Sequence, residues 1–210
     1  MNLIQIPILL FSVIIHEYAH GWMAERKGDD TARVMGRLTL NPVPHIDLFG
    51  TIILPLICYM SNFPMFGWAK PVPVNPYRLN DPKNDMVWVS LAGPLSNFAL
   101  AVAAAFVMWA VRSFPVLPME SASALYQLMQ YTLVINVILP VFNLFPVPPL
   151  DGSKVVMGLL PSELAYRYAG LERYSFLLII LLMSTNIFWI LLGPVINFIV
   201  IALGGGARFY

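Results

Sequence analysis

Two histidines and a glutamate lie close together near the start of the chain, in the sequence His16-Glu17-Tyr18-Ala19-His20. On a helix, residues four positions apart face the same side, so the imidazoles of His16 and His20 can bind one metal ion. Glu17 lies beside them and can act as a general base toward a water molecule at that ion. The spacing therefore predicts a zinc-dependent hydrolase with one zinc ion per chain, in which Glu17 is catalytic.

A catalytic zinc ion takes three protein ligands and keeps a position for water, so a third ligand is required. The chain has one cysteine, Cys58, which excludes a multi-cysteine site. Asp151 is the candidate ligand, because it follows an apolar segment that ends in a proline-rich break and it precedes Gly152. Alternatively, Asp151 caps a short helix that extends to Leu160, and both roles are compatible because each can use one carboxylate oxygen.

The composition indicates an integral membrane protein. Hydrophobic residues make up 59% of the 210 residues and charged residues 11%, whereas soluble domains average about 45–50% and about 25%. The formal net charge of +1 predicts no nucleic-acid partner. Residues 1–15 carry neither a charge nor a basic leader, so we expect a retained helix in place of a cleaved signal. Ionisable groups in such a segment are costly unless they face a protein cavity and serve a function.

Five apolar stretches predict the membrane segments: 3–24, 46–60, 87–111, 125–147 and 174–203. Segment 46–60 is shorter than the roughly 20 residues of a spanning helix, and segment 174–203 crosses either once or twice because polar residues interrupt it. We therefore predict an all-α polytopic membrane protein with about four to six transmembrane segments and a re-entrant segment at 46–60. Segments 33–40 and 66–74 predict short membrane-associated β-strands, within a single domain that covers residues 1–210.

Basic residues are concentrated in three connections, with four in 25–45, three in 61–86 and three in 152–173, against one in 112–124. If segment 46–60 re-enters the membrane, ten of these eleven residues lie on one side. If it spans, the split is five against six. The positive-inside rule favours the first arrangement, in which the N-terminus is outside. His20 and Asp151 then both lie near the cytoplasmic face, as a shared metal ion requires.

The two motifs together resemble those of the site-2 protease family of intramembrane zinc metalloproteases, the M50 peptidases, in a small form without a PDZ or CBS domain. The HExxH motif of the family corresponds to residues 16–20 and its N-x-x-P-x-P-x-x-D-G motif to residues 143–152. The resemblance implies that His16, His20 and Asp151 hold zinc and that Glu17 is the general base.

The resemblance also implies roles for two asparagines. Asn143 is expected to stabilise the oxyanion or to position the substrate. The sequence Gly93-Pro94-x-x-Asn97 resembles the family's helix between the two motifs, and Asn97 is expected to bind substrate. His45 either serves the substrate side of the site or forms a hydrogen bond with Asp47 or the backbone.

The resemblance implies an intramembrane zinc endopeptidase (a hydrolase of the EC 3.4.24 type) that performs regulated intramembrane proteolysis. Its expected partners are single-span membrane proteins or peptides and the lipid bilayer, and its expected location is the bacterial inner membrane, with the active site toward the cytoplasm. The alternative is a polytopic ion or proton transporter that uses the same buried cluster. That function predicts further inward-facing carboxylates and often an inverted repeat. The sequence shows only one short pair of similar segments, LAGPLSNF at 91–98 and LLGPVINF at 191–198.

Overall fold

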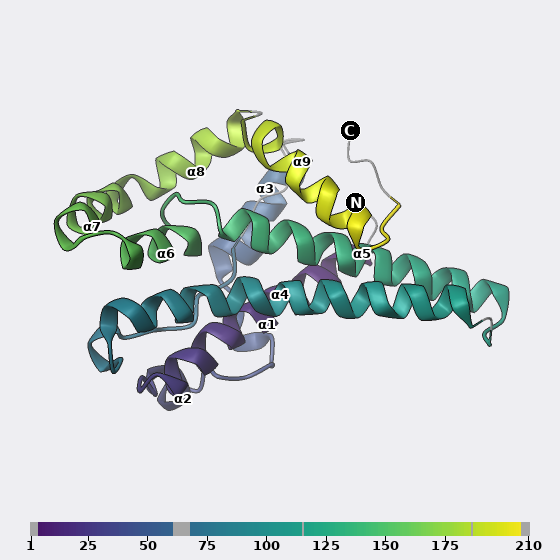
Figure 1. The fold of residues 1–210 in the computed structure, drawn as a ribbon, viewed down its shortest axis with the longest axis horizontal. Helices are drawn as coiled ribbons and strands as arrows, with labels where there is room; N and C mark the ends of the chain where they lie inside the picture. Colours follow the sequence, from purple (N-terminus) through teal and green to yellow (C-terminus); the bar gives the residue numbers. More distant parts are fainter. Residues whose placement is uncertain (1–3, 61–67, 115, 186, 207–210) are drawn as a thin grey trace.

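A computed structural model describes residues 4–60, 68–114, 116–185 and 187–206 of the chain (Figure 1). The α-helices are α1 (Gln5–Arg26), α2 (Thr31–Val34), α3 (Leu54–Met60), α4 (Pro82–Ser113), α5 (Met119–Asn143), α6 (Asp151–Leu159), α7 (Ser162–Ala169), α8 (Ser175–Ser184) and α9 (Ile187–Ala202). Four shorter helical turns accompany them: η1 (Val43–His45), η2 (Leu48–Ile53), η3 (Pro76–Arg78) and η4 (Gly170–Tyr174).

The prediction of short β-strands is wrong, because the residues that the structure describes contain no strand. The start of segment 33–40 belongs to α2, and the side chain of Asp29 accepts a hydrogen bond from Thr31 N as this helix begins. In the second segment, two prolines remove backbone donors, and the N–H of Val72 binds a side chain instead of a strand. Residues 66 and 67 of that segment lie outside the described residues.

The predicted number of transmembrane segments is also wrong. In the described part of the chain, two helices, α4 and α5, are long and apolar enough to cross a membrane, against the four to six expected. Segment 174–203 divides into α8 and α9, with 10 and 16 residues, which are shorter than a spanning helix. Segment 46–60 forms η2 and α3, with six and seven residues. Its path relative to a membrane stays untested.

The centre of the fold is an antiparallel pair formed by α4 and α5, which lie side by side in Figure 1. The buried core contains Ala101, Ala104 and Met108 of α4, Leu133, Val134, Val137 and Val141 of α5, and Ile196 and Val200 of α9. The two alanines allow the helix backbones to approach closely. Helix α1 packs against both α4 and α5, and α6 packs against α4. This packing brings the two sequence motifs together beside one stretch of α4.

Candidate metal centre

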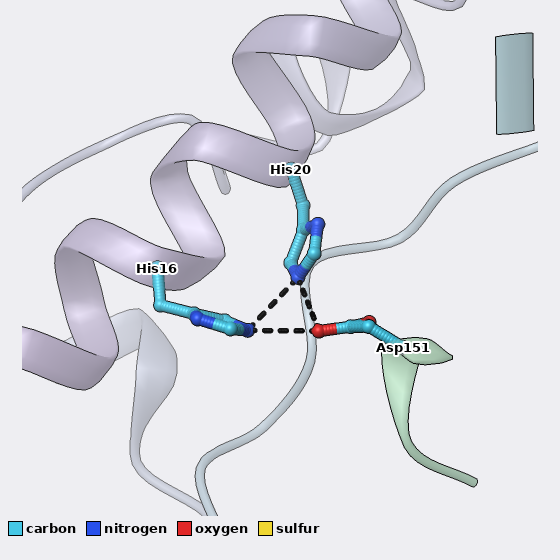
Figure 2. Close-up of side chains that lie close together, drawn as sticks. All are labelled: His16, His20 and Asp151. Carbon is cyan, nitrogen blue, oxygen red and sulfur yellow. Dashed lines mark hydrogen bonds and ion pairs between the residues drawn. The ribbon is translucent and has the colours of Figure 1, made fainter. Parts of the chain in front are cut away.

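His16, His20 and Asp151 converge on a single point between α1 and α6 (Figure 2). The distance from Asp151 Oδ2 is 3.0 Å to His16 Nε2 and 3.1 Å to His20 Nε2. The two Nε2 atoms are 3.0 Å apart, and all three side chains are buried. Ligand atoms around a tetrahedral zinc ion, at about 2.0–2.1 Å from it, are separated by about 3.3 Å. The spacing of the three atoms therefore fits a zinc ion.

The outer nitrogens of the two imidazoles show which ring atoms face the centre. His20 Nδ1 donates a hydrogen bond to the carbonyl oxygen of Val89 (2.7 Å), and His16 Nδ1 donates to Asn97 Oδ1 (2.6 Å). Each neutral ring therefore presents the lone pair of Nε2 toward the carboxylate of Asp151. Three lone-pair atoms at about this distance repel one another unless a cation lies among them. The donor set and its outer hydrogen bonds are those of a zinc site.

Gly93 provides the space for this centre. A Cβ atom at residue 93 would lie 2.4 Å from His20 Nε2 and 2.6 Å from His16 Nε2. The backbone of α4 therefore passes directly against the two ligand nitrogens. Only a glycine leaves room there, which explains why the Gly-Pro sequence lies at this point of α4.

Asp151 is the first residue of α6, and the residue at the N-cap is Leu150, without a capping side-chain hydrogen bond. The capping alternative for Asp151 is therefore not adopted. Gly152 lets the preceding loop fold against α6, since a Cβ atom there would lie 2.1 Å from the carbonyl oxygen of Leu144. A carboxylate binds a metal ion in its ionised form, and Asp151 Oδ2 faces the two Nε2 atoms.

The carboxylate of Glu17 is held by a backbone donor from a distant segment. Glu17 Oε2 accepts a hydrogen bond from Val72 N at 2.7 Å. Prolines flank Val72 on both sides, so its N–H is the single backbone donor of that tripeptide. The buried Arg37 holds the same segment, because its Nη2 donates to the carbonyl oxygens of Lys70 (2.8 Å) and Pro71 (3.2 Å). These supporting contacts were not predicted from the sequence.

Asn97 lies inside the helix core beside His16, and its predicted role in substrate binding stays a prediction. The residue is 0% exposed. Its Nδ2 donates to the carbonyl oxygen of Ser12 (3.1 Å) and to Asn136 Oδ1 (2.8 Å), and its Oδ1 accepts from His16. Both amide hydrogens are thus used inside the protein. In this structure Asn97 contacts the candidate metal ligand His16.

Two other candidate residues form hydrogen bonds with backbone carbonyls. Asn143 is the last residue of α5, and its Nδ2 donates to the carbonyl oxygen of Leu139 at 3.0 Å. Its role toward the oxyanion stays a prediction. His45 is buried, and its Nε2 donates to the carbonyl oxygen of Thr39 at 2.9 Å. This contact agrees with the backbone hydrogen bond that the sequence suggested as one of two possibilities.

Comparisons with known proteins place the chain among peptidases. The model of peptidase family M50 matches residues 4–118 and 116–185. The chain is 36% identical to YwhC of Bacillus subtilis over 190 residues, which cover 90% of this chain and 84% of YwhC. It is 29% identical to Rip2 of Mycolicibacterium smegmatis, over 84% of this chain and 64% of Rip2. It is 25% identical to zinc metalloprotease MJ0392 of Methanocaldococcus jannaschii, over 91% of this chain and 47% of MJ0392. No solved structure matches the chain.

Proposed function

The chain belongs to peptidase family M50, and we propose that it hydrolyses peptide bonds within the membrane-spanning segments of single-span proteins or peptides. It is a zinc-dependent metallopeptidase of the membrane. The observation that supports the site is the convergence of His16, His20 and Asp151, whose ligand atoms lie 3.0–3.1 Å apart beside Gly93. The matched family and relatives give no support to the alternative of ion or proton transport.

Each residue of the metal centre has a separate role in the proposed reaction. His16 and His20 would hold the metal through Nε2, and Asp151 would hold it through Oδ2. Zinc, when bound, polarises the peptide carbonyl and makes water more acidic. Glu17 takes a proton from the attacking water and passes it to the leaving amine. The N–H of Val72 holds the Glu17 carboxylate by a hydrogen bond to Oε2.

The proposed substrates follow from the location of the site in a membrane protein. A membrane-spanning helix satisfies its backbone hydrogen bonds internally, so a peptide bond must leave the helix before it can be cut. We expect the enzyme to cleave a single-span reporter that carries a helix-destabilising residue pair in its spanning segment. Cleavage should stop when a chelator removes the metal and return when zinc is added. Purified enzyme and reporter in liposomes, with products separated by gel electrophoresis, provide the measurement.

A matched reporter tests the substrate class. It carries the same sequence without flanking membrane anchors, as a soluble peptide. If the enzyme cleaves the soluble peptide at the same rate and leaves the membrane-embedded reporter intact, the proposed substrate class is wrong even though the peptidase activity stands.

We also propose a multi-pass arrangement in a bacterial inner membrane, with the metal centre toward the cytoplasm. Helix α2, the start of α4, and α6 and α7 gather at one end of the molecule, and the α4–α5 connection lies at the other (Figure 1). Lys83 Nζ donates to the carbonyl oxygen of Leu160, and Asn80 N donates to that of Lys27, which ties these segments together. Four basic residues lie in these helices, Arg33, Lys83, Lys154 and Arg167, against Arg112 at the other end of α4, and the positive-inside rule assigns the more basic end to the cytoplasm. Gly93 lies about a third of the way along α4 from this end.

Cysteine labelling tests this orientation. In a Cys58→Ser background, Arg167→Cys places a thiol in α7 and Val116→Cys places one in the α4–α5 connection, where both native residues are exposed. An impermeant maleimide added to intact bacterial spheroplasts should label residue 116 and should label residue 167 only after lysis. The reverse pattern would place the basic end outside and would contradict the proposed orientation.

A further inference from the structure

A line of buried polar groups extends from His16 into the helix core, away from the metal. It contains Asn97 of α4, Asn136 of α5 and Ser12 of α1, with exposed fractions of 0%, 0% and 1%. We propose that Asn136, acting through Asn97, sets the tautomer of His16 and thereby makes its Nε2 available to the metal. The proposal rests on the metal centre described above. It assigns a positioning role to Asn136, whose hydrogen bonds within the described part of the chain go to Asn97, Ser12 and Thr132.

Backbone carbonyls determine how Asn136 is oriented. The hydroxyl of Ser12 donates to the carbonyl oxygen of Ile8 at 2.8 Å, so Ser12 Oγ is left to accept. Asn136 Nδ2 donates to this Oγ at 2.8 Å and to the carbonyl oxygen of Thr132 at 2.9 Å. A carbonyl oxygen can only accept, so the NH₂ group of Asn136 must point toward Thr132. Its Oδ1 is therefore directed toward Asn97.

Two acceptors set the orientation of Asn97, the side-chain oxygen of Asn136 and the backbone carbonyl oxygen of Ser12. Asn97 Nδ2 donates one hydrogen to Asn136 Oδ1 (2.8 Å) and the other to the carbonyl oxygen of Ser12 (3.1 Å). Its Oδ1 is left to face His16 Nδ1 at 2.6 Å. The hydrogen of His16 is therefore held on Nδ1, and the lone pair of Nε2 is directed at Asp151. Every donor in this line points away from the metal centre.

The two histidines differ in how their tautomers are specified. His20 Nδ1 donates directly to the backbone carbonyl of Val89, which cannot rotate. His16 depends instead on a side-chain amide that could turn by 180°. In that orientation Nδ2 of Asn97 would face His16 Nδ1, the hydrogen would move to Nε2, and this nitrogen could not bind a metal. Asn136 Oδ1 and the carbonyl oxygen of Ser12 oppose this rotation, because each accepts one hydrogen of Asn97 Nδ2, and removal of Asn136 leaves only the longer contact of 3.1 Å with Ser12.

The test replaces Asn136 with leucine, which has a similar volume and offers no hydrogen bond. Outer partners of zinc ligands typically contribute 10- to 100-fold to metal affinity. We therefore expect the zinc Kd, measured by chelator competition, to rise by about tenfold or more. In the metal-free variant, ¹⁵N NMR of labelled histidine should show His16 moving from the Nδ1–H toward the Nε2–H tautomer. The chain has three histidines, so their signals can be assigned individually.

A conservative variant shows whether Asn136 acts by orienting Asn97 or only by filling space in the core. Asn136→Asp, neutral in this buried site, still accepts from Asn97 and should retain a zinc Kd and a His16 tautomer close to those of the wild type. Thr132→Val is the matched control, because it removes a hydroxyl that donates to Leu128 and keeps the carbonyl that Asn136 uses. It should leave both readouts unchanged. Should Asn136→Leu not fold, Asn136→Val carries the same expectation.

The proposal is overturned if Asn136→Leu retains the wild-type zinc Kd and the Nδ1–H tautomer of His16. Equal losses in Asn136→Leu and Asn136→Asp would also overturn it, because the acceptor toward Asn97 would then be irrelevant. Since the tautomer is measured without metal, this result is distinct from a failure of the proposed function. A wild-type protein that binds no zinc would contradict that function and would leave the tautomer measurement valid.

Discussion

Replacement of Glu17 by glutamine is expected to abolish peptide cleavage while zinc remains bound. Glutamine has nearly the same shape, and its side-chain oxygen can still accept the hydrogen bond from Val72 N. It cannot take up a proton from water, and the loss of a general base lowers the rate by about 10²–10⁴-fold. His16, His20 and Asp151 are untouched, so the zinc content per chain should equal that of the wild type. Reporter cleavage in liposomes and metal analysis of the same preparation provide the two measurements.

Glu25→Gln is the matched control for this experiment. Glu25 lies on the same helix, and its carboxylate pairs with Arg33 at the surface, away from the metal centre. This variant should cleave the reporter at the wild-type rate. If Glu17→Gln also cleaved at the wild-type rate with zinc bound, the assignment of Glu17 as the general base would have to be abandoned.

Gly93→Ala is expected to weaken zinc binding by roughly 100-fold, although it adds only one methyl group. The new Cβ atom would lie 2.4 Å and 2.6 Å from the two ligand nitrogens, so either α4 or the imidazoles must move. Overpacking of a tight interior costs about 1–3 kcal/mol, and the upper part of that range corresponds to roughly 100-fold in Kd. Here the strain falls on the ligand atoms themselves. Chelator competition measures the affinity, and reporter cleavage should fall with it.

Gly170→Ala provides the control for the glycine substitution. Nothing lies within 4 Å of a Cβ atom built at Gly170, so we expect unchanged zinc affinity and unchanged thermal stability. Wild-type zinc affinity in Gly93→Ala would show that α4 does not pass against the ligand nitrogens as described. The comparison is informative because both variants add the same group to a helical turn.

The predicted strands failed for a reason that local sequence could not show. Segment 66–74 has the pattern of an edge strand, but its described part forms scattered hydrogen bonds in place of a strand ladder: Trp68 N and Lys70 N donate to the backbone carbonyls of Gly50 and His45, and other groups bind side chains. Val72 N donates to Glu17, and the carbonyl of Lys70 accepts from Arg37. A pattern of apolar residues and prolines indicates strand propensity. It does not show which distant side chain will form a hydrogen bond with a given backbone group. The helical stretches were predicted better, because their apolar length is a local property.

The buried hydrogen bonds behind His16 were also not predicted, because their partners come from distant parts of the chain. The sequence does contain a signal for them. Asn136 stands alone among apolar neighbours in segment 133–142, and an uncompensated amide in such a segment is costly. That cost indicates a buried partner. It does not identify the partner, because Asn97 and Ser12 belong to other helices and lie 39 and 124 residues away.

The sequence alone determined the ligand types, the pairing of His16 with His20 and the adjacent base, because the period of a helix places residues four apart on one face. It also indicated a membrane protein through composition, which needs no fold. Only the tertiary structure decided that Asp151 meets His20 across 131 residues, that Gly93 makes room for the metal and that Asn97 faces a ligand. These outcomes depend on how α1, α4 and α6 pack, and packing arises from long-range contacts that residue spacing does not encode.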